Sequence, residues 1–209
     1  MNQIKQYSIL DLYLEIAKHD NFEKNAGEIL DSGVDINSCE ISSFSPLMFA
    51  AYRGWLNQVK FLLENGASLQ HQTPNGKNAL FVSCIDRPSF ITFEIYRKLN
   101  REQNEVVAQY LNEERKKYES YADNLERREI IEYLLNQGIN PDCLCGYHGL
   151  LENVSAMDAY MMNFFLKDLS IIDLLKAAGI PLRTKRSDLY VQGNMQLVRK
   201  KLNYYDSIK

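Results

Sequence analysis

One short segment of the sequence gathers side chains that bind metal ions. Cys143, Cys145 and His148 lie within six consecutive residues. Structural zinc sites use four Cys or His ligands in a tetrahedron, so Cys39 or His71 would have to complete this set from a neighbouring loop. We interpret the segment as small, half-buried residues of a long loop, and we expect no metal and no other cofactor.

The sequence offers no constellation that is typical of catalysis. It has no glycine-rich phosphate loop, no nucleophile elbow and no His-Glu-x-x-His pattern. The acidic residues stand where helix-surface charges are expected, and their spacing indicates no acid/base pair. We therefore expect that the protein is not an enzyme.

Composition excludes several other classes of protein. The 209 residues include 24 basic and 27 acidic side chains, for a formal net charge of −3, which argues against a general binder of nucleic acids or anionic membranes. No apolar stretch approaches the ~18 residues of a spanning helix, and the first residues lack the apolar run of a signal peptide. The four Cys show no disulfide framework, so we expect reduced thiols and a cytoplasmic location.

Four glycines at related spacings indicate the helices that must position any site. Gly33, Gly66, Gly138 and Gly179 each end an apolar, helix-like segment. Gly66 follows Gly33 by 33 residues, and the two later intervals are longer. A 33-residue unit with insertions accounts for all four positions, and such a period is the signature of a repeat array.

The second unit carries the most specific motif. Ser45-Pro46-Leu47-Met48 begins a helix that continues through Ala50 and Ala51 and ends at Gly54, and a second apolar stripe ends at Gly66. These residues resemble the ankyrin repeat, with Met48 in place of the family's His. The resemblance implies an all-α solenoid of helix-turn-helix repeats.

The register gives four units and a cap within a single array. Their expected bounds are repeat 1 at about 10–37, repeat 2 at about 41–69, repeat 3 at about 74–141 with an insertion at about 86–127, repeat 4 at about 150–183, and a C-terminal capping helix at about 191–206.

The insertion is predicted from a long stretch without helix breakers. No Gly or Pro occurs between Pro88 and Gly138, so we expect residues 89–137 to be almost wholly helical. Long insertions in compact domains are often functional, and Tyr is favoured in interfaces. Two interpretations stay open: a scaffold elaboration, or an arm that binds a partner through Tyr110, Tyr118 and Tyr121.

The resemblance also implies where a partner would bind. In ankyrin proteins the variable contact positions lie before the Pro-containing box and at the end of the first helix. The corresponding residues here are Phe44, Tyr52, Arg53, Trp55, Asn75, Lys77, Ile85 and Asp86. Trp, Tyr and Arg dominate interface hot spots, although Trp55 fits equally well as a packing residue.

The sequence thus predicts a non-catalytic module that binds another protein. Within that class we favour an inhibitor or immunity-type protein for one specific partner, monomeric when free, with no nucleic acid and no membrane as partner. An adaptor or effector is the alternative within the class. The alternative from another class is a metal- or nucleic-acid-linked protein that uses the Cys143/Cys145/His148 loop.

Overall fold

A computed structural model describes residues 6–18, 21–40, 43–85, 122–147, 151–163, 167–192 and 195–208 of the chain. These residues form helices and one two-stranded antiparallel hairpin. In chain order the elements are α1 (Ile9–Lys18), α2 (Phe22–Asp31), α3 (Pro46–Arg53), α4 (Leu56–Glu64), α5 (Ala79–Cys84), α8 (Ala122–Asn136), β1 (Cys145–Tyr147), β2 (Leu151–Val154), α9 (Ala156–Met162), α10 (Ser170–Ala177), α11 (Arg186–Gln192) and α12 (Met195–Ser207).

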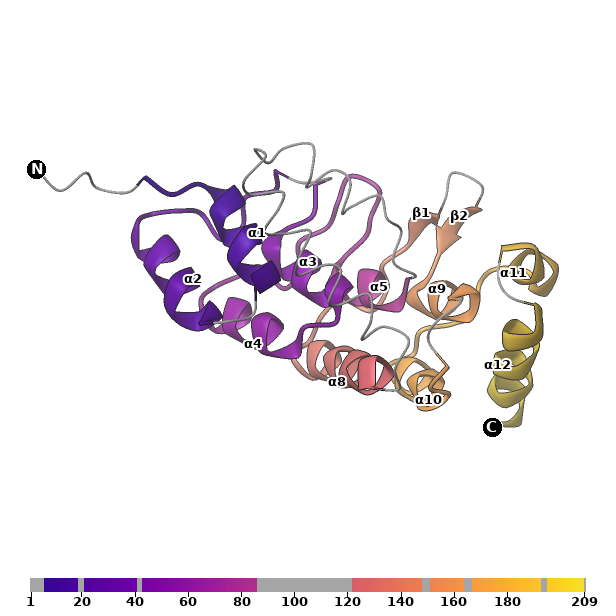
Figure 1. The fold of residues 1–209 in the computed structure, drawn as a ribbon. Coiled ribbons are helices and arrows are strands. Elements are labelled where there is room, and N and C mark those ends of the chain that lie inside the picture. The colour runs from indigo at the N-terminus through magenta and orange to yellow at the C-terminus, as the bar shows by residue number, and fades with distance from the viewer. Residues whose placement is uncertain are drawn as a thin grey trace, which may run out of the picture.

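The helices stack as pairs in two rows, which confirms the all-α repeat solenoid (Figure 1). The first helices of the pairs, α1, α3, α5 and α9, contact one another in sequence. The second helices, α2, α4, α8 and α10, form the neighbouring row. The shared faces of the two rows hold the apolar core, in which Leu12, Leu62, Leu134 and Leu175 are wholly buried.

Three first helices begin at equivalent positions of the repeat. Ser45, Asn78 and Ser155 occupy the N-cap, and each side-chain oxygen accepts a hydrogen bond from the backbone N–H three residues later, at 2.9–3.2 Å. These bonds satisfy donors that a helix start otherwise leaves unpaired. Pro46 follows at the first helical position, where its missing N–H leaves no bond unmade.

The second helices end at the glycines that set the register. Gly66 and Gly138 have φ values of 90° and 81°, and the residue after each donates to Leu62 O (2.9 Å) or Leu134 O (3.2 Å). A positive φ strains any residue with a Cβ. Gly33 and Gly179 have the same backbone conformation, so the four predicted helix stops are confirmed, and Leu62 and Leu134 are equivalent.

The segments between pairs project to one side of the helix rows, and we call them fingers. Finger 1 is residues 33–44, finger 2 is residues 66–77, finger 3 is residues 138–154 and finger 4 is residues 179–185. Finger 3 contains the hairpin of β1 and β2, in which Cys145 pairs with Val154. The hairpin of finger 3 lies at the upper edge of the array in Figure 1.

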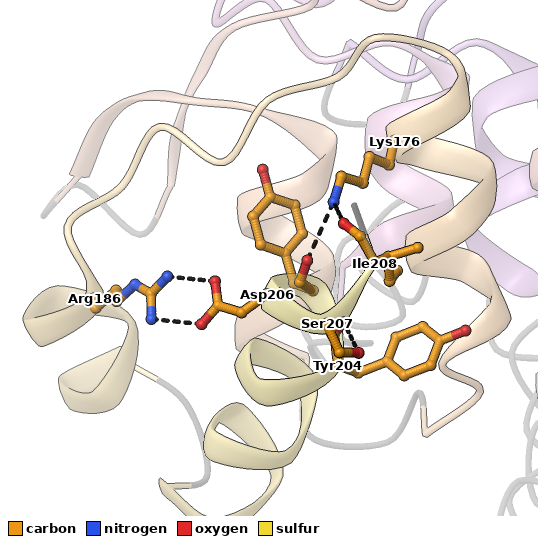
Figure 2. A network of polar contacts seen from close by, with 7 residues as sticks. Lys176, Arg186, Tyr204, Asp206, Ser207 and Ile208 are labelled. Atoms are coloured by element: carbon orange, nitrogen blue, oxygen red, sulfur yellow. Dashed lines mark hydrogen bonds and ion pairs between the residues drawn. The ribbon is translucent and has the colours of Figure 1, made fainter.

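The end of the array after α10 differs from the single capping helix expected at 191–206. Two helices, α11 and α12, lie here. Figure 2 shows the polar contacts that hold them: both guanidinium nitrogens of Arg186 donate to Asp206 at 2.6 and 2.9 Å, and Lys176 Nζ donates to the carbonyls of Tyr205 (3.2 Å) and Ile208. Tyr204 also donates to Asp173 at 2.9 Å. The ends of α12 and α11 are therefore fixed to each other and to α10.

Candidate functional site

The expected contact residues at the end of α3 are buried, which corrects the sequence-based interpretation. Tyr52, Arg53 and Trp55 are 1%, 6% and 5% exposed. The Tyr52 ring packs edge-on against Phe44 at 6.1 Å, and the Arg53 guanidinium lies 5.0 Å from the centre of the Trp55 ring. Of the two interpretations of Trp55, packing is the one that its environment supports.

Phe44 and Ile85 are buried as well, each at 5% exposure. A partner cannot reach these five side chains without displacing the core around them. The assumption that the stack leaves the end of the first helix open is wrong, because other parts of the chain cover it.

One of those parts is Arg127 in the first half of α8. Its side chain is 2% exposed, and its two terminal nitrogens donate to Tyr52 O at 2.5 Å and to Ser83 O at 2.9 Å. Both carbonyls belong to the last turns of first helices, which leave carbonyls without helical partners. A buried cation is favourable at a helix C-terminus because the helix dipole is negative there.

The next two units repeat this arrangement with other residues. Asn163 Nδ2 donates to Cys84 O at 3.0 Å. Lys201 of α12 is wholly buried, donates to Tyr160 O (2.6 Å) and Asn163 O (3.0 Å), and lies 4.1 Å from the centre of the Tyr160 ring. The C-terminal ends of α3, α5 and α9 are thus satisfied by the chain's own side chains.

A second set of polar contacts joins the fingers. Asn37 donates to Gly66 O (3.3 Å) and accepts from Ser68 N (2.7 Å). Gln70, which is 33 residues later, donates to Gly138 O (2.8 Å) and accepts from Asn140 N (2.9 Å). We call each such contact an amide bridge: a carboxamide four residues after one helix-stop glycine bonds to the next helix-stop glycine and to the residue two beyond it.

The amide bridge is replaced between fingers 3 and 4. The corresponding residues are Asp142, whose carboxylate cannot donate, and Pro181, which has no N–H. Instead, the buried carboxylate of Asp158 accepts from Arg183 N (2.9 Å) and Thr184 N (2.8 Å), and Ser155 Oγ donates to Pro181 O (2.8 Å). Amide bridges thus join fingers 1, 2 and 3, whereas finger 4 is bonded to the start of α9 through Ser155 and Asp158.

Among the described members of the predicted contact set, those at the tip of finger 2 are accessible. Asn75 is exposed and Lys77 is half-buried. A hollow of about 490 Å³ is lined by residues of this tip and of finger 3. Residues that line it include Pro74, Asn75, Gly76, Leu144, Gly146 and Asn153. Gly76 has a φ of 81°, and a Cβ there would collide with the carbonyl of Leu144, so the close approach of the two fingers requires glycine.

Four of the predicted site residues lie outside the described residues. They are Asp86, Tyr110, Tyr118 and Tyr121. The predicted helix over 89–137 is observed where the structure describes it, as α8.

The thiols of the candidate metal loop are buried within the finger packing. Cys143 Sγ donates to Gly76 O, and Cys145 Sγ donates to Val154 O at 3.7 Å. Burial raises the pKa of both thiols, which disfavours the thiolate that zinc requires. His148 lies outside the described residues. Within the described part of the chain, no group of three or more Cys, His, Asp or Glu residues is arranged to hold a metal ion.

A thiol also lies beside a histidine between fingers 1 and 2. Cys39 Sγ is 3.3 Å from His71 Nε2, which in turn is 3.2 Å from Ser43 O. Burial raises the pKa of the Cys39 thiol, and the carboxylate of Asp35 raises it further. This pair joins two fingers, and its thiol is held in the protonated form.

The sequence contains a signal for the contacts between fingers that the sequence analysis did not use. The amide bridges are visible as Asn37 and Gln70, each four residues after a helix-stop glycine. Arg127 and Lys201 carry no comparable signal, because the carbonyls that they bond lie far away in the sequence.

Comparisons with known proteins identify the first part of the array. The family model described as ankyrin repeats, in three copies, matches residues 14–99. A comparison with curated proteins gave no match. Among the residues described, no helix is long and apolar enough to cross a membrane.

Proposed function

Because residues 14–99 match the ankyrin-repeat family, we propose that the chain acts as an inhibitor or immunity-type protein for one specific protein partner. Ankyrin repeats indicate a module of protein–protein interaction and are generally non-catalytic. We further propose that the protein is cytoplasmic, is monomeric when free, and binds neither nucleic acid nor membrane.

The observation that carries the proposal is the rigid row of fingers. Amide bridges join fingers 1, 2 and 3 through four hydrogen bonds of 2.7–3.3 Å. A surface that is already ordered loses little conformational entropy when a partner binds. The binding surface that we propose is therefore the accessible tip of finger 2, with Asn75 and Lys77, together with the hollow beside finger 3.

Burial assigns the other aromatic and basic candidates a structural role. Tyr52 and Arg53 lie in the packed core, so their substitution changes stability before it changes recognition. The insertion residues Tyr110, Tyr118 and Tyr121 remain a second candidate surface, which the same experiment separates from the first.

The test begins with affinity capture on the immobilised full chain and identification of bound proteins by mass spectrometry. The captured protein is then titrated against variants. Asn75→Ala with Lys77→Ala should weaken binding at least about thirtyfold, because hot-spot truncations cost ~2 kcal/mol or more. Asn57→Ala, at an exposed position of α4, is the matched control and should bind as the parent does.

Three outcomes would contradict parts of the proposal. Normal binding by the double variant, with loss on substitution of Tyr110, Tyr118 and Tyr121, would transfer recognition to the insertion. Simultaneous capture of two different proteins would favour an adaptor. One zinc per chain, lost on Cys143→Ser, would favour the metal-linked alternative.

A further inference from the structure

The first unit of the array repeats the backbone geometry that accepts an amide bridge. Gly33 has a φ of 94°, close to the 90° of Gly66. Asp35 O accepts from Ser38 N at 3.1 Å, as Ser68 O accepts from His71 N at 3.4 Å in finger 2. Finger 1 therefore has the same turn as the finger that Asn37 bonds.

The side chain of Asp35 fixes this turn in the same way as its counterpart in finger 3. Asp35 Oδ1 accepts from Asn37 N at 2.9 Å, and Asn140 Oδ1 accepts from Asp142 N at 3.0 Å. Local bonds thus support the bridge-accepting conformation of the backbone around Asp35.

The two polar groups that a bridge would use are open at this end. Among the described residues, none donates to Gly33 O and none accepts from Asp35 N. Both Gly33 and Asp35 are exposed. Their counterparts in fingers 2 and 3 are each bonded to a carboxamide, so these two groups are the corresponding pair in the first unit.

A hollow of about 580 Å³ is lined by residues that include Gly33 and Asp35. Its walls combine polar residues with the half-buried side chains of Tyr7 and Val34, and it includes Ser8 at the start of α1. The hollow is at the α1–α2 end of the array, remote from α12 (Figure 1).

We infer that Gly33 O and Asp35 N–H form a docking site for an extended segment of another polypeptide that presents an Asn or Gln side chain. Among side chains, the carboxamide of Asn or Gln offers an N–H donor and a C=O acceptor on one rigid group, matching an acceptor and a donor two residues apart. Lys and Arg lack the acceptor, and Asp and Glu lack the donor. The apolar walls formed by Tyr7 and Val34 suit a neighbouring apolar residue of that segment.

A second copy of this chain is not the occupant that the observations favour. In finger 4 the position equivalent to Asn37 and Gln70 is Arg183, which cannot accept a hydrogen bond. The site is also separate from the tip of finger 2, so it stands or falls independently of the proposed function.

The experiment uses the chain's own bridging sequence as the probe. A peptide with the sequence of residues 67–78, capped at both ends, contains Gln70 and is titrated into the isotopically labelled full chain. We expect saturable shifts of the Gly33, Val34 and Asp35 amide signals, with a dissociation constant on the order of 1 mM. The same peptide with Gln70→Glu should bind at least about tenfold more weakly, because it leaves Gly33 O without a donor.

Protein variants separate the backbone groups from the side chain. Asp35→Pro removes the N–H at a position where finger 4 naturally has Pro181, and it should abolish the shifts. Asp35→Asn keeps the N–H and the turn, as Asn140 does in finger 3, and should bind as the parent does.

The controls decide between the possible results. Equal binding of the Gln and Glu peptides, or unchanged binding by Asp35→Pro, would overturn the carboxamide assignment. Absence of any shift at ~10 mM peptide would overturn the site itself. If Asp35→Pro fails to fold, the comparison of the two peptides on the parent chain still decides.

Discussion

At the scale of single residues, two buried cations replace the partner contacts expected at the ends of the first helices. Arg127 joins the ends of α3 and α5, and Lys201 satisfies the end of α9. Each is charged and buried, and each donates to two backbone carbonyls. The residues around them, including Tyr52, are therefore part of the interior.

This arrangement predicts a large loss of stability in Arg127→Met. The change keeps much of the side-chain volume but leaves Tyr52 O and Ser83 O without a donor, and a buried unsatisfied group costs ~1–3 kcal/mol. We expect the free energy of unfolding to fall by about 2–5 kcal/mol in urea titrations. Arg199→Met, at an exposed position of α12, should stay within about 0.5 kcal/mol of the parent. Similar values for the two variants would contradict the role of Arg127.

Helix ends show how far the sequence alone could lead. The helix stops at Gly66 and Gly138 could be predicted because glycine tolerates their φ values without strain. The caps at Ser45 and Ser155 could be predicted because each side chain bonds to a backbone N–H three residues later. Such features depend on neighbours three to five residues away, so the register reveals them. The burial of Tyr52 depends on Arg127, which is 75 residues away, and no local pattern encodes that contact.

At the scale of elements, we expect alanine to destabilise the chain at Gly66 and to stabilise it at Gly27. Gly66→Ala places a Cβ at a φ of 90°, which costs roughly 1–2 kcal/mol for an L-residue. Gly27 lies within α2, has no such φ, and an added Cβ would meet no atom within 4 Å. Gly27→Ala should therefore stabilise the chain by about 0.5–1 kcal/mol. Thermal unfolding of the two variants, followed by circular dichroism, tests the difference, and a stabilising Gly66→Ala would refute the stop assignment.

At the scale of the whole molecule, the ion pair in Figure 2 predicts how the α11–α12 end responds to acid. The hydrogen bonds from Arg186 lower the pKa of the Asp206 carboxyl below its usual 3.8. A lowered folded-state pKa stabilises the protein above the unfolded pKa, and that contribution is lost as the pH falls through the folded value. The melting temperature of Arg186→Gln should thus lie below that of the parent at pH 6, and the difference should vanish as the carboxyl becomes protonated. A difference that persists unchanged at the lowest pH would exclude this ion pair as its cause.

The amide bridges give the finger row a direction. Each bridge takes its carboxamide from the earlier finger and its two backbone groups from the later one, so the two ends of the row differ chemically. At the α12 end, Arg183 occupies the carboxamide position of finger 4 and cannot accept a hydrogen bond, so it cannot form a further bridge of this kind. The α1 end keeps the pair that a bridge needs. A designer who lengthens this solenoid should accordingly graft new 33-residue modules onto the α1 end, with Asn or Gln four residues after the module's glycine. The same graft beyond finger 4 would need Arg183 replaced by Asn or Gln first.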